Sequence, residues 1–446
     1  MNNVVVKLKK NLNAIILRTA KEKKRFLYLP NKDFTRKGKI SFQVLLKLIF
    51  SMDSGSLGKE LLEYFSIGRQ NISASAFVQL REKVMPEAFE HIFREFTRKL
   101  PHIRRYEGFR LLAVDGCKFG SVENSQEPDN HFKTFPNKKG FNIHNLNALY
   151  DLCNRFYVDA ILRTGKKDSI YKDLNIMVDR SPIRGKTIVL ADRAYTSYNV
   201  FEHIAKKGWN YVIRATDLPF TGSIISKTSF PATGAADQWF HLKATRRCGK
   251  VTSVQRDIYR YMPSNQVFDF LPPGSTKEYP LHFRVVRLEV SPGIYELLVT
   301  NLEASKFPPE KLKTLYHLRW GIETSFRELK YTIGVLSFHS KKDESIKQEI
   351  FAGLTKYNFC EAITTQAIIM QEAERVSCKK TRKHVYQVNF TMAIHICLGY
   401  FKGKYRATSQ EVLREILKHV EPLRTGRAFL RKKQRRTIIS FLYRMN

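Results

Sequence analysis

Two aspartates and one glutamate, far apart along the chain, are the residues whose types and spacing could do chemistry. Asp115 ends the apolar run 111–114, and Asp192 ends the run 188–191. Runs of this kind are typical of buried parallel strands, and functional residues in open α/β sheets gather at the carboxyl ends of such strands. Together with Glu323, the two aspartates would supply the hard oxygen ligands that a pair of Mg²⁺ ions needs.

Residues 316–330 carry reactive or phosphate-binding side chains at helical spacing. At about 100° per residue, four of them fall within an arc of roughly 60°, namely Tyr316, Arg319, Glu323 and Lys330. The adjoining arc is apolar and would bury one side of a helix; it contains Leu315, Leu318, Ile322, Phe326 and Leu329. Trp320 lies on the far side of this helix, and we expect it to pack in the core.

Each of these features has a simpler interpretation. The polar arc of 316–330 could be a solvated face in which Arg319 pairs with Glu323. An aspartate at a strand end is often a turn former or a helix cap. The combination of Asp115, Asp192 and Glu323 favours the functional interpretation over these alternatives.

The charge of the chain predicts a polyanionic partner. Its 446 residues include 77 Lys and Arg against 41 Asp and Glu, a formal net charge of +36. Contacts to phosphates release counterions, so such a surplus favours nucleic acid. An acidic membrane surface is the other option, but no apolar run approaches the roughly 20 residues that span a bilayer. The start of the chain, 1–7, also lacks the apolar core of a signal peptide.

Cysteine and histidine usage argues against other kinds of site. The six cysteines are scattered and form no Cys-x-x-Cys pair. We therefore expect a protein of the reducing cytoplasm without a structural zinc site. Histidine is sparse near the candidate site, which argues against a Ser/His or Cys/His nucleophile.

Taken in order, these residues resemble the DDE transposases of bacterial insertion sequences, in the group named after insertion sequence four. The unbroken Tyr-x2-Arg-x3-Glu-x6-Lys signature at 316–330 carries the resemblance, together with segments 114–116, 144–151 and 191–195. The similarity spans roughly residues 105–360. It implies that Asp115, Asp192 and Glu323 are the catalytic residues and the metal ligands, with Mg²⁺ as cofactor and Mn²⁺ as a possible substitute.

The resemblance also implies a function and partners. Such an enzyme binds the terminal inverted repeats of its element, cleaves the ends by two-metal phosphodiester hydrolysis and joins the 3′-hydroxyl to target DNA. The partner is double-stranded DNA, held by a homodimer that pairs two ends, on the nucleoid of a bacterial cytoplasm. Expected DNA-binding residues are Tyr316, Arg319, Lys330, Arg214 and Arg193. For Arg214, a surface salt bridge is an equal alternative.

Two other functions fit the same residues. An inactive or domesticated relative would bind DNA without cutting it, although the complete acidic triad counts against this. A metal-dependent nuclease on the same fold would cut DNA without strand transfer.

The expected fold class is α/β, with a ribonuclease H-like core interrupted by an all-β insertion. The pattern predicts a helical DNA-binding region at 1–104, the first part of the core at 105–216, the insertion at 217–294, the second part of the core at 295–370 and a basic helical region at 371–446. In this fold the first and fourth strands are neighbours, so Asp115 and Asp192 would be close in space.

Within the first region, a helix at 56–65, a break at Gly68 and a helix that starts at Ser73 or Ser75 resemble a helix-turn-helix. Base-facing candidates are Arg69, Gln70, Asn71, Ser75 and Gln79. In the last region, the basic run 424–436 predicts phosphate contacts.

Overall fold

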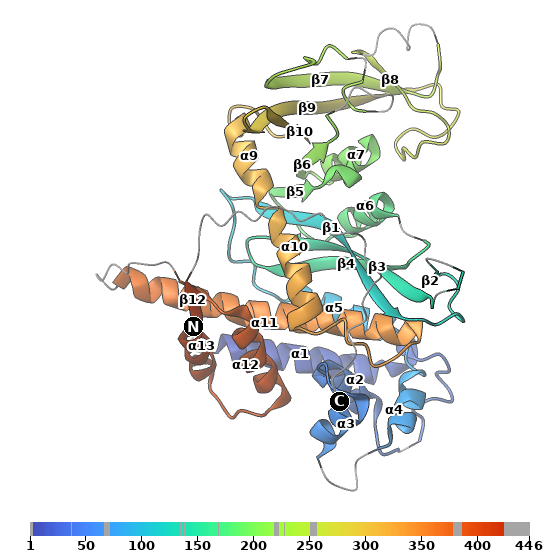
Figure 1. Ribbon diagram of the computed structural model, residues 1–446, viewed down its shortest axis with the longest axis vertical. Coiled ribbons are helices and arrows are strands. Elements are labelled where there is room, and N and C mark those ends of the chain that lie inside the picture. Colours follow the sequence, from blue (N-terminus) through green and yellow to red (C-terminus); the bar gives the residue numbers. More distant parts are fainter. Residues whose placement is uncertain are drawn as a thin grey trace.

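A computed structural model describes residues 3–36, 38–66, 72–133, 136–137, 139–167, 169–217, 223–226, 228–249, 257–377 and 386–422, apart from the side chains of 375–377. In these residues ten strands form one large mixed sheet, and most of the helices pack at one end of it (Figure 1). The structure is thus α/β with a large central sheet. None of the described helices is long and apolar enough to cross a bilayer.

The central part of the sheet follows the predicted order of strands and helices. β1 (Arg110–Val122), β3 (Phe141–Asp151) and β4 (Phe156–Thr164) pair antiparallel, and α6 (Ile170–Asp179) leads to β5 (Thr187–Ala191). Then α7 (Tyr198–Lys206) leads to β6 (Asn210–Ala215). β5 lies between β1 and β6 and is parallel to both. The predicted neighbourhood of the first and fourth strands is therefore confirmed.

β1 is longer than predicted. Only Arg110–Val114 pairs in parallel with β5, whereas the strand continues through Asp115 to Val122 in antiparallel pairing with β3. The expectation that this strand ends at Asp115 is wrong. The reason is that β3 offers backbone donors and acceptors beyond the end of β5, which satisfy the β1 backbone.

The sheet extends past β6 through strands that follow later in the chain. β10 (Ile294–Thr300) pairs with β6, and β9 (Glu278–Ser291) pairs with β10. β7 (Ala236–Thr245) and β8 (Tyr259–Tyr261) complete this side, and the short β2 (His131–Phe132) pairs with β3 at the other (Figure 1). The segment 217–294 therefore adds strands to the main sheet.

The N-terminal region is helical in the described residues. It contains α1 (Val4–Lys21), the 3₁₀ turn η1 (Lys23–Phe26), α2 (Phe42–Ser51), α3 (Leu57–Phe65), α4 (Ala74–Arg81) and α5 (Glu87–Arg98). Ser56 and Ser73 cap α3 and α4 by accepting a hydrogen bond from a first-turn N–H, as expected for helix starts. Ser75 and Gln79 are exposed on α4. Gly68, Arg69, Gln70 and Asn71 lie outside the described residues.

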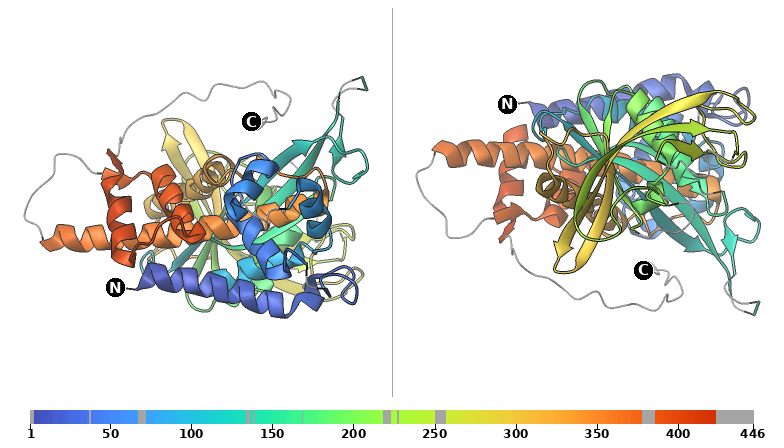
Figure 2. Two further views of the ribbon diagram at one scale, coloured as in Figure 1. Left: turned by 90° about the horizontal axis from the view of Figure 1, so that it is seen from below. Right: turned by 90° about the horizontal axis from the view of Figure 1, so that it is seen from above.

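The C-terminal region contains a long helix that crosses the helical end of the molecule. α11 (Asp343–Ser377) packs on α5 and β4 and runs beside α1 (Figure 2). α12 (Phe390–Lys402) and α13 (Ser409–Lys418) follow, and β11 (Tyr386–Val388) pairs with β12 (Val420–Pro422). The basic run 424–436 lies outside the described residues.

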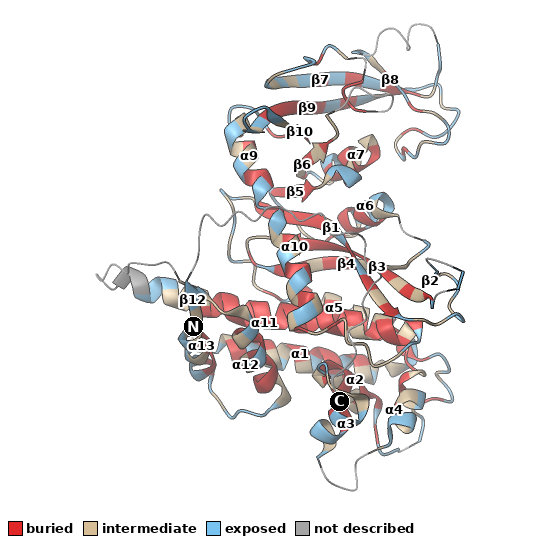
Figure 3. Cartoon of the chain, viewed as in Figure 1, coloured by how far each residue is buried: buried red, intermediate tan, exposed pale blue. Residues whose placement is uncertain are grey.

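The two faces of β1 are buried against different helices. Ala113 and Cys117 belong to a core shared with the N-terminal helices and α11, whereas Leu112 and Val114 face α6 and α7. Figure 3 shows this burial along the central strands. Because side chains alternate along a strand, Asp115 is in phase with the first set. The acid therefore belongs to the face of the sheet that carries α11.

Candidate active site

β1 and β5 place two aspartates at neighbouring positions. Val114 and Ala191 are register partners at the end of their parallel ladder. Asp115 and Asp192 therefore follow on adjacent strands, which lie about 4.8 Å apart. The Gly116 N–H donates a hydrogen bond to Asp115 Oδ1 at 2.8 Å. Asp192 directly precedes the short 3₁₀ helix η2 (Arg193–Tyr195).

The signature segment is helical but divided. α9 (Pro309–His317) begins with proline at its first turn, and α10 (Trp320–Arg327) leads into η3 (Glu328–Thr332), a single π-helical turn. Leu318 and Arg319 between α9 and α10 have helical backbone angles. The N–H groups of both residues bond to carbonyls three residues back, so the helix tightens there.

This division changes which residues of the segment are buried. Leu315 and Ile322 are fully buried as expected, but Leu318 is 39% exposed. Trp320 is 42% exposed, so its predicted place in the core is wrong. The Arg319 guanidinium lies 4.9 Å from the Trp320 ring centroid, which accounts for the indole on the outer side of the helix. Because of the tightened turn, Leu318 does not belong to the buried apolar face of the helix.

Arg319 connects the sheet to the signature helix. Its side chain is buried, and Nη2 donates a hydrogen bond to Glu323 Oε1 at 2.9 Å. Nη1 lies 3.5 Å from Asp115 Oδ2. Asp115 and Glu323 therefore share one guanidinium, although they are 208 positions apart in the sequence.

The charges of the other two acids act on the Asp115 carboxyl. Burial raises the pKa of the Asp115 carboxyl to about 6, and the charges of Glu323 and Asp192 raise it further, while the Gly116 N–H and Arg319 oppose the shift. Nevertheless, no three His, Cys, Asp or Glu side chains in the described residues are close enough together to hold a metal ion. Asp115 and Glu323 thus meet at Arg319, with Asp192 on the adjacent strand, and the three acids do not share one point.

Tyr316 and Arg214 lie beside this cluster. The Tyr316 hydroxyl is buried and has no hydrogen-bond partner among the described residues. Burial raises the pKa of Tyr316, so the hydroxyl keeps its proton and can donate. Arg214 Nη2 lies 3.3 Å from Glu296 Oε1, and 39% of the Arg214 side chain is exposed. The ion pair considered for Arg214 is therefore present.

Lys330 and Arg193 occupy different places from Arg319. The Lys330 ammonium lies 5.6 Å from the Phe119 ring centroid, on the extended part of β1. Burial raises the pKa of the Cys117 thiol to about 11, and the Lys330 charge partly opposes this. Arg193 is exposed on η2 next to Asp192. The polar side chains of the signature thus spread along β1 from Asp115 to Phe119.

Comparison with known proteins assigns this arrangement to a family. The family model described as "Transposase DDE domain" matches residues 107–359, a range that contains Asp115, Asp192 and Glu323. The chain belongs to the DDE transposase family.

Two known proteins illustrate the relationship. Over 303 residues the chain is 37% identical to "Transposase InsG for insertion sequence element IS4" of Escherichia coli (strain K12), which covers 65% of this chain and 61% of that protein. The chain thus spans less than two thirds of this relative. A structure of the piggyBac transposase synaptic complex with hairpin DNA aligns over 96% of this chain and 85% of that chain. Its sequence identity of 12% and TM-score of 0.41 are too low to support an argument.

Further residues hold the turn that follows Asp192, and their role was not predicted from the sequence. The Tyr195 hydroxyl donates to Asn147 Oδ1 at 3.3 Å, and Asn147 Nδ2 donates to Asp173 Oδ2 at 2.7 Å. The Thr196 hydroxyl donates to the Arg214 carbonyl at 2.7 Å. These bonds fix the turn after Asp192 against β3 and β6. Asn147 and Tyr195 lie within 144–151 and 191–195, the segments that carry the family resemblance.

Proposed function

We propose that the chain is a DNA transposase that binds the terminal inverted repeats of an insertion sequence, cleaves its ends and joins the 3′-hydroxyl to target DNA. The observation that supports this best is the shared contact of Arg319 with Asp115 and Glu323, with Asp192 on the adjacent strand. The net charge of +36 supports double-stranded DNA as the partner.

The chemistry of the donor set suits divalent metal ions, although the three described acids are not close enough together to hold one ion in this structure. Asp115, Asp192 and Glu323 would hold Mg²⁺, or Mn²⁺ in its place, because these ions prefer carboxylate oxygens. The raised pKa of Asp115, about 6, reflects burial and the repulsion of two further acids, which a bound cation would relieve. Ions held by these acids would supply the activation of a water or a 3′-hydroxyl and the stabilisation of the leaving oxygen.

The surrounding side chains would bind and orient the DNA. Arg319 holds Asp115 and Glu323 in place, and its planar fork suits a phosphate beside the scissile bond. The Tyr316 hydroxyl is a buried donor without a partner in the described part of the chain, and it would donate to the same backbone. Lys330 and the exposed Arg193 would add phosphate contacts on either side. Arg214 would exchange Glu296 for a phosphate of the cut end.

The fold and assembly follow from the same proposal. We take the strand order β4-β3-β1-β5-β6 as a ribonuclease H-like core, with 217–294 as its insertion. Residues 1–104 and 371–446 would then be the DNA-binding and basic terminal regions. Because two ends must be cut together, we propose a homodimer that acts on the nucleoid of a bacterial cytoplasm.

The test uses labelled DNA that carries the inverted repeats which flank the coding region. The full chain with Mg²⁺ is expected to shift this DNA, cut it and join it to a second duplex. Asp115→Ala, Asp192→Ala or Glu323→Ala should each abolish cleavage and leave the shift unchanged, because the acids hold metal and the DNA is bound by other residues.

Each result leads to a definite conclusion. A shift without cleavage by the wild type would mean a binding protein, and cleavage without joining would mean a nuclease. Wild-type cleavage rates in any of the three alanine variants would remove that acid from the site.

A further inference from the structure

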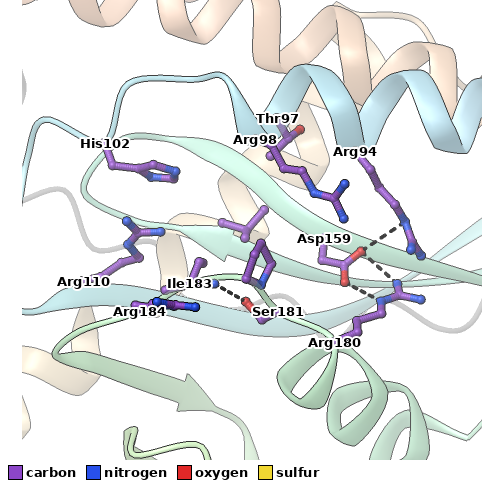
Figure 4. Close-up of a pocket in the computed structure, with 12 residues that line it drawn as sticks. Arg94, Thr97, Arg98, His102, Arg110, Asp159, Arg180, Ser181, Ile183 and Arg184 are labelled. Carbon is purple, nitrogen blue, oxygen red and sulfur yellow. Dashed lines mark hydrogen bonds and ion pairs between the residues drawn. The ribbon is translucent and has the colours of Figure 1, made fainter. Parts of the chain in front are cut away.

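A second charged site lies at the opposite end of the parallel strands. An open cavity of about 440 Å³ is lined by α5, the start of β1, β4 and the loop after α6 (Figure 4). Arg110 pairs with Thr187 where the β1–β5 ladder starts. It is five residues before Asp115, which places the cavity roughly 16 Å along the strand from the acids. Five arginines line the cavity: Arg94, Arg98, Arg110, Arg180 and Arg184.

Arg110 is the buried cation of this cavity. It is 7% exposed, and its Nη1 is buried without a hydrogen-bond partner in the described residues. The charge of Asp151 acts on it, but Asn154 Nδ2 already donates to both oxygens of that carboxylate at 3.0 Å. A buried charge is costly unless it is paired. The unsatisfied guanidinium donor therefore points to a ligand of opposite charge.

The remaining charges of the cavity do not supply that ligand. Asp159, the one acid among the lining residues, accepts two hydrogen bonds from Arg180 at 2.7 and 2.8 Å. Arg94 lies 3.9 Å from the same carboxylate and keeps a buried Nε without a hydrogen-bond partner in the described chain. In Figure 4, Arg110 and Arg184 lie on the other side of the cavity from this ion pair. Among the lining residues cations outnumber anions, although Arg94 also pairs with Glu90 and Arg98 with Glu95 from outside the lining.

Size and shape favour a small ligand. Sites for small molecules commonly measure about 300–1,000 Å³ and combine apolar walls with a few charged groups. Here Val158, Pro182 and Ile183 provide the apolar wall. Arginine forks match the oxygens of a phosphate. We propose that this cavity binds a small phosphorylated molecule through its phosphate groups.

The site is separate from the acidic cluster. Arg110 and Asp115 are five residues apart on β1, so the cavity and the acids lie roughly 16 Å apart along the strand. The proposal therefore stands whether or not the chain cleaves DNA.

Inorganic pyrophosphate is the probe for the test. Calorimetric titration of the full chain should show one saturable site, and hydrogen exchange should show protection in α5, at the start of β1 and in the loop 181–185. Arg184→Gln should weaken binding by about tenfold or more, the usual effect of losing a charged hydrogen bond. The control Lys277→Gln removes one exposed charge before β9 and should change affinity by less than about twofold.

Arg110→Met separates a ligand-binding role from a structural one. It should weaken pyrophosphate binding like Arg184→Gln, yet raise the melting temperature of the ligand-free protein because it removes an unpaired buried charge. If this variant does not fold, Arg110 has a structural role, and Arg184→Gln alone decides the binding site.

Three results would overturn the proposal. The first is the absence of saturable pyrophosphate binding. The second is an equal loss of affinity in Arg184→Gln and Lys277→Gln, which would indicate general charge attraction. The third is competition in which a short duplex of unrelated sequence displaces pyrophosphate and protects the same segments. The cavity would then be part of a DNA surface.

Discussion

The two ends of the β1–β5 pair carry opposite imbalances of charge. At the carboxyl ends, Arg319 contacts Asp115 and Glu323, and Asp192 follows on the adjacent strand. At the amino ends, Arg110 and Arg184 face a cavity whose acid, Asp159, is already paired. One end has more anions than its cation neutralises, and the other has more cations than its anion neutralises. Such imbalance is expected where a ligand of opposite charge completes the site.

A buried charge does not by itself indicate a ligand. Arg81 on α4 is 1% exposed, but Nε donates to Gln348 at 2.8 Å, Nη1 to Glu349 at 2.7 Å and Nη2 to the Ser345 carbonyl. These bonds dock the N-terminal helices on α11. Arg81 and Arg110 are thus buried to a similar depth but differ in their hydrogen-bond partners, and on the proposal above this difference separates a structural arginine from one that binds a ligand.

The largest predicted effect comes from replacing Arg81, the buried arginine whose donors all have partners. Arg81→Met should lower the free energy of unfolding by about 3–5 kcal/mol, because it leaves Glu349 buried without its main cation. Burial raises the pKa of Glu349, but the charges of Arg81 and His339 hold it down at about 2. Without Arg81 the pKa should rise, so the loss of stability should be larger at pH 7 than at pH 4.

Urea unfolding at the two pH values measures this effect, with Arg110→Met as the matched variant. Both changes remove one buried guanidinium, yet they should change stability in opposite directions. A loss of similar size in both variants would contradict the distinction between a paired and an unpaired arginine.

The next effect concerns the acidic end. Arg319→Gln should slow cleavage of end DNA by about 100-fold, the usual range for removing one donor at a reacting centre. Because Arg319 lowers the pKa of Asp115, the variant should also move the acid limb of the pH–rate profile to higher pH. Arg327→Gln, an exposed position on the same helix, is the control and should leave both the rate and the profile unchanged. An unshifted profile in Arg319→Gln would mean that Arg319 does not act on Asp115.

Much of the fold could be predicted because its signals are local. Apolar runs predicted β1 and β5, and the pattern around 56–65 and Ser73 predicted α3 and the start of α4. The adjacency of Asp115 and Asp192 followed from the strand order. In each of these cases a few neighbouring residues contain the physical cause.

The remaining features depend on contacts between distant segments. The Arg319 contact with Asp115 spans 204 positions, and helical spacing indicated only its partner Glu323. The extension of β1 past Asp115 depends on β3, which the run 111–115 does not contain. The arginine cavity draws on α5, β1, β4 and the loop after α6, so its residues form no motif in the sequence.

The smallest predicted effect tests whether Asp115 binds a ligand or stabilises the fold. Its pKa of about 6 lies above the ordinary value of 3.8, so between about pH 4 and 6 the folded chain keeps a proton that the unfolded chain has lost. The free energy of unfolding therefore falls as pH rises through this window. Asp115→Asn should remove this dependence and stabilise the metal-free protein by about 2 kcal/mol at neutral pH.

Asp173→Asn is the matched change at a structural acid. Asp173 is fully buried and accepts hydrogen bonds from Arg163 at 2.7 and 2.9 Å and from Asn147 at 2.7 Å. Its replacement should destabilise the protein because the Arg163 charge loses its partner. Thermal unfolding from pH 4 to 8 without metal compares the two variants. A loss of stability in both would place Asp115 among the acids that hold the fold together, and would leave the acidic end without the excess of negative charge that a metal site needs.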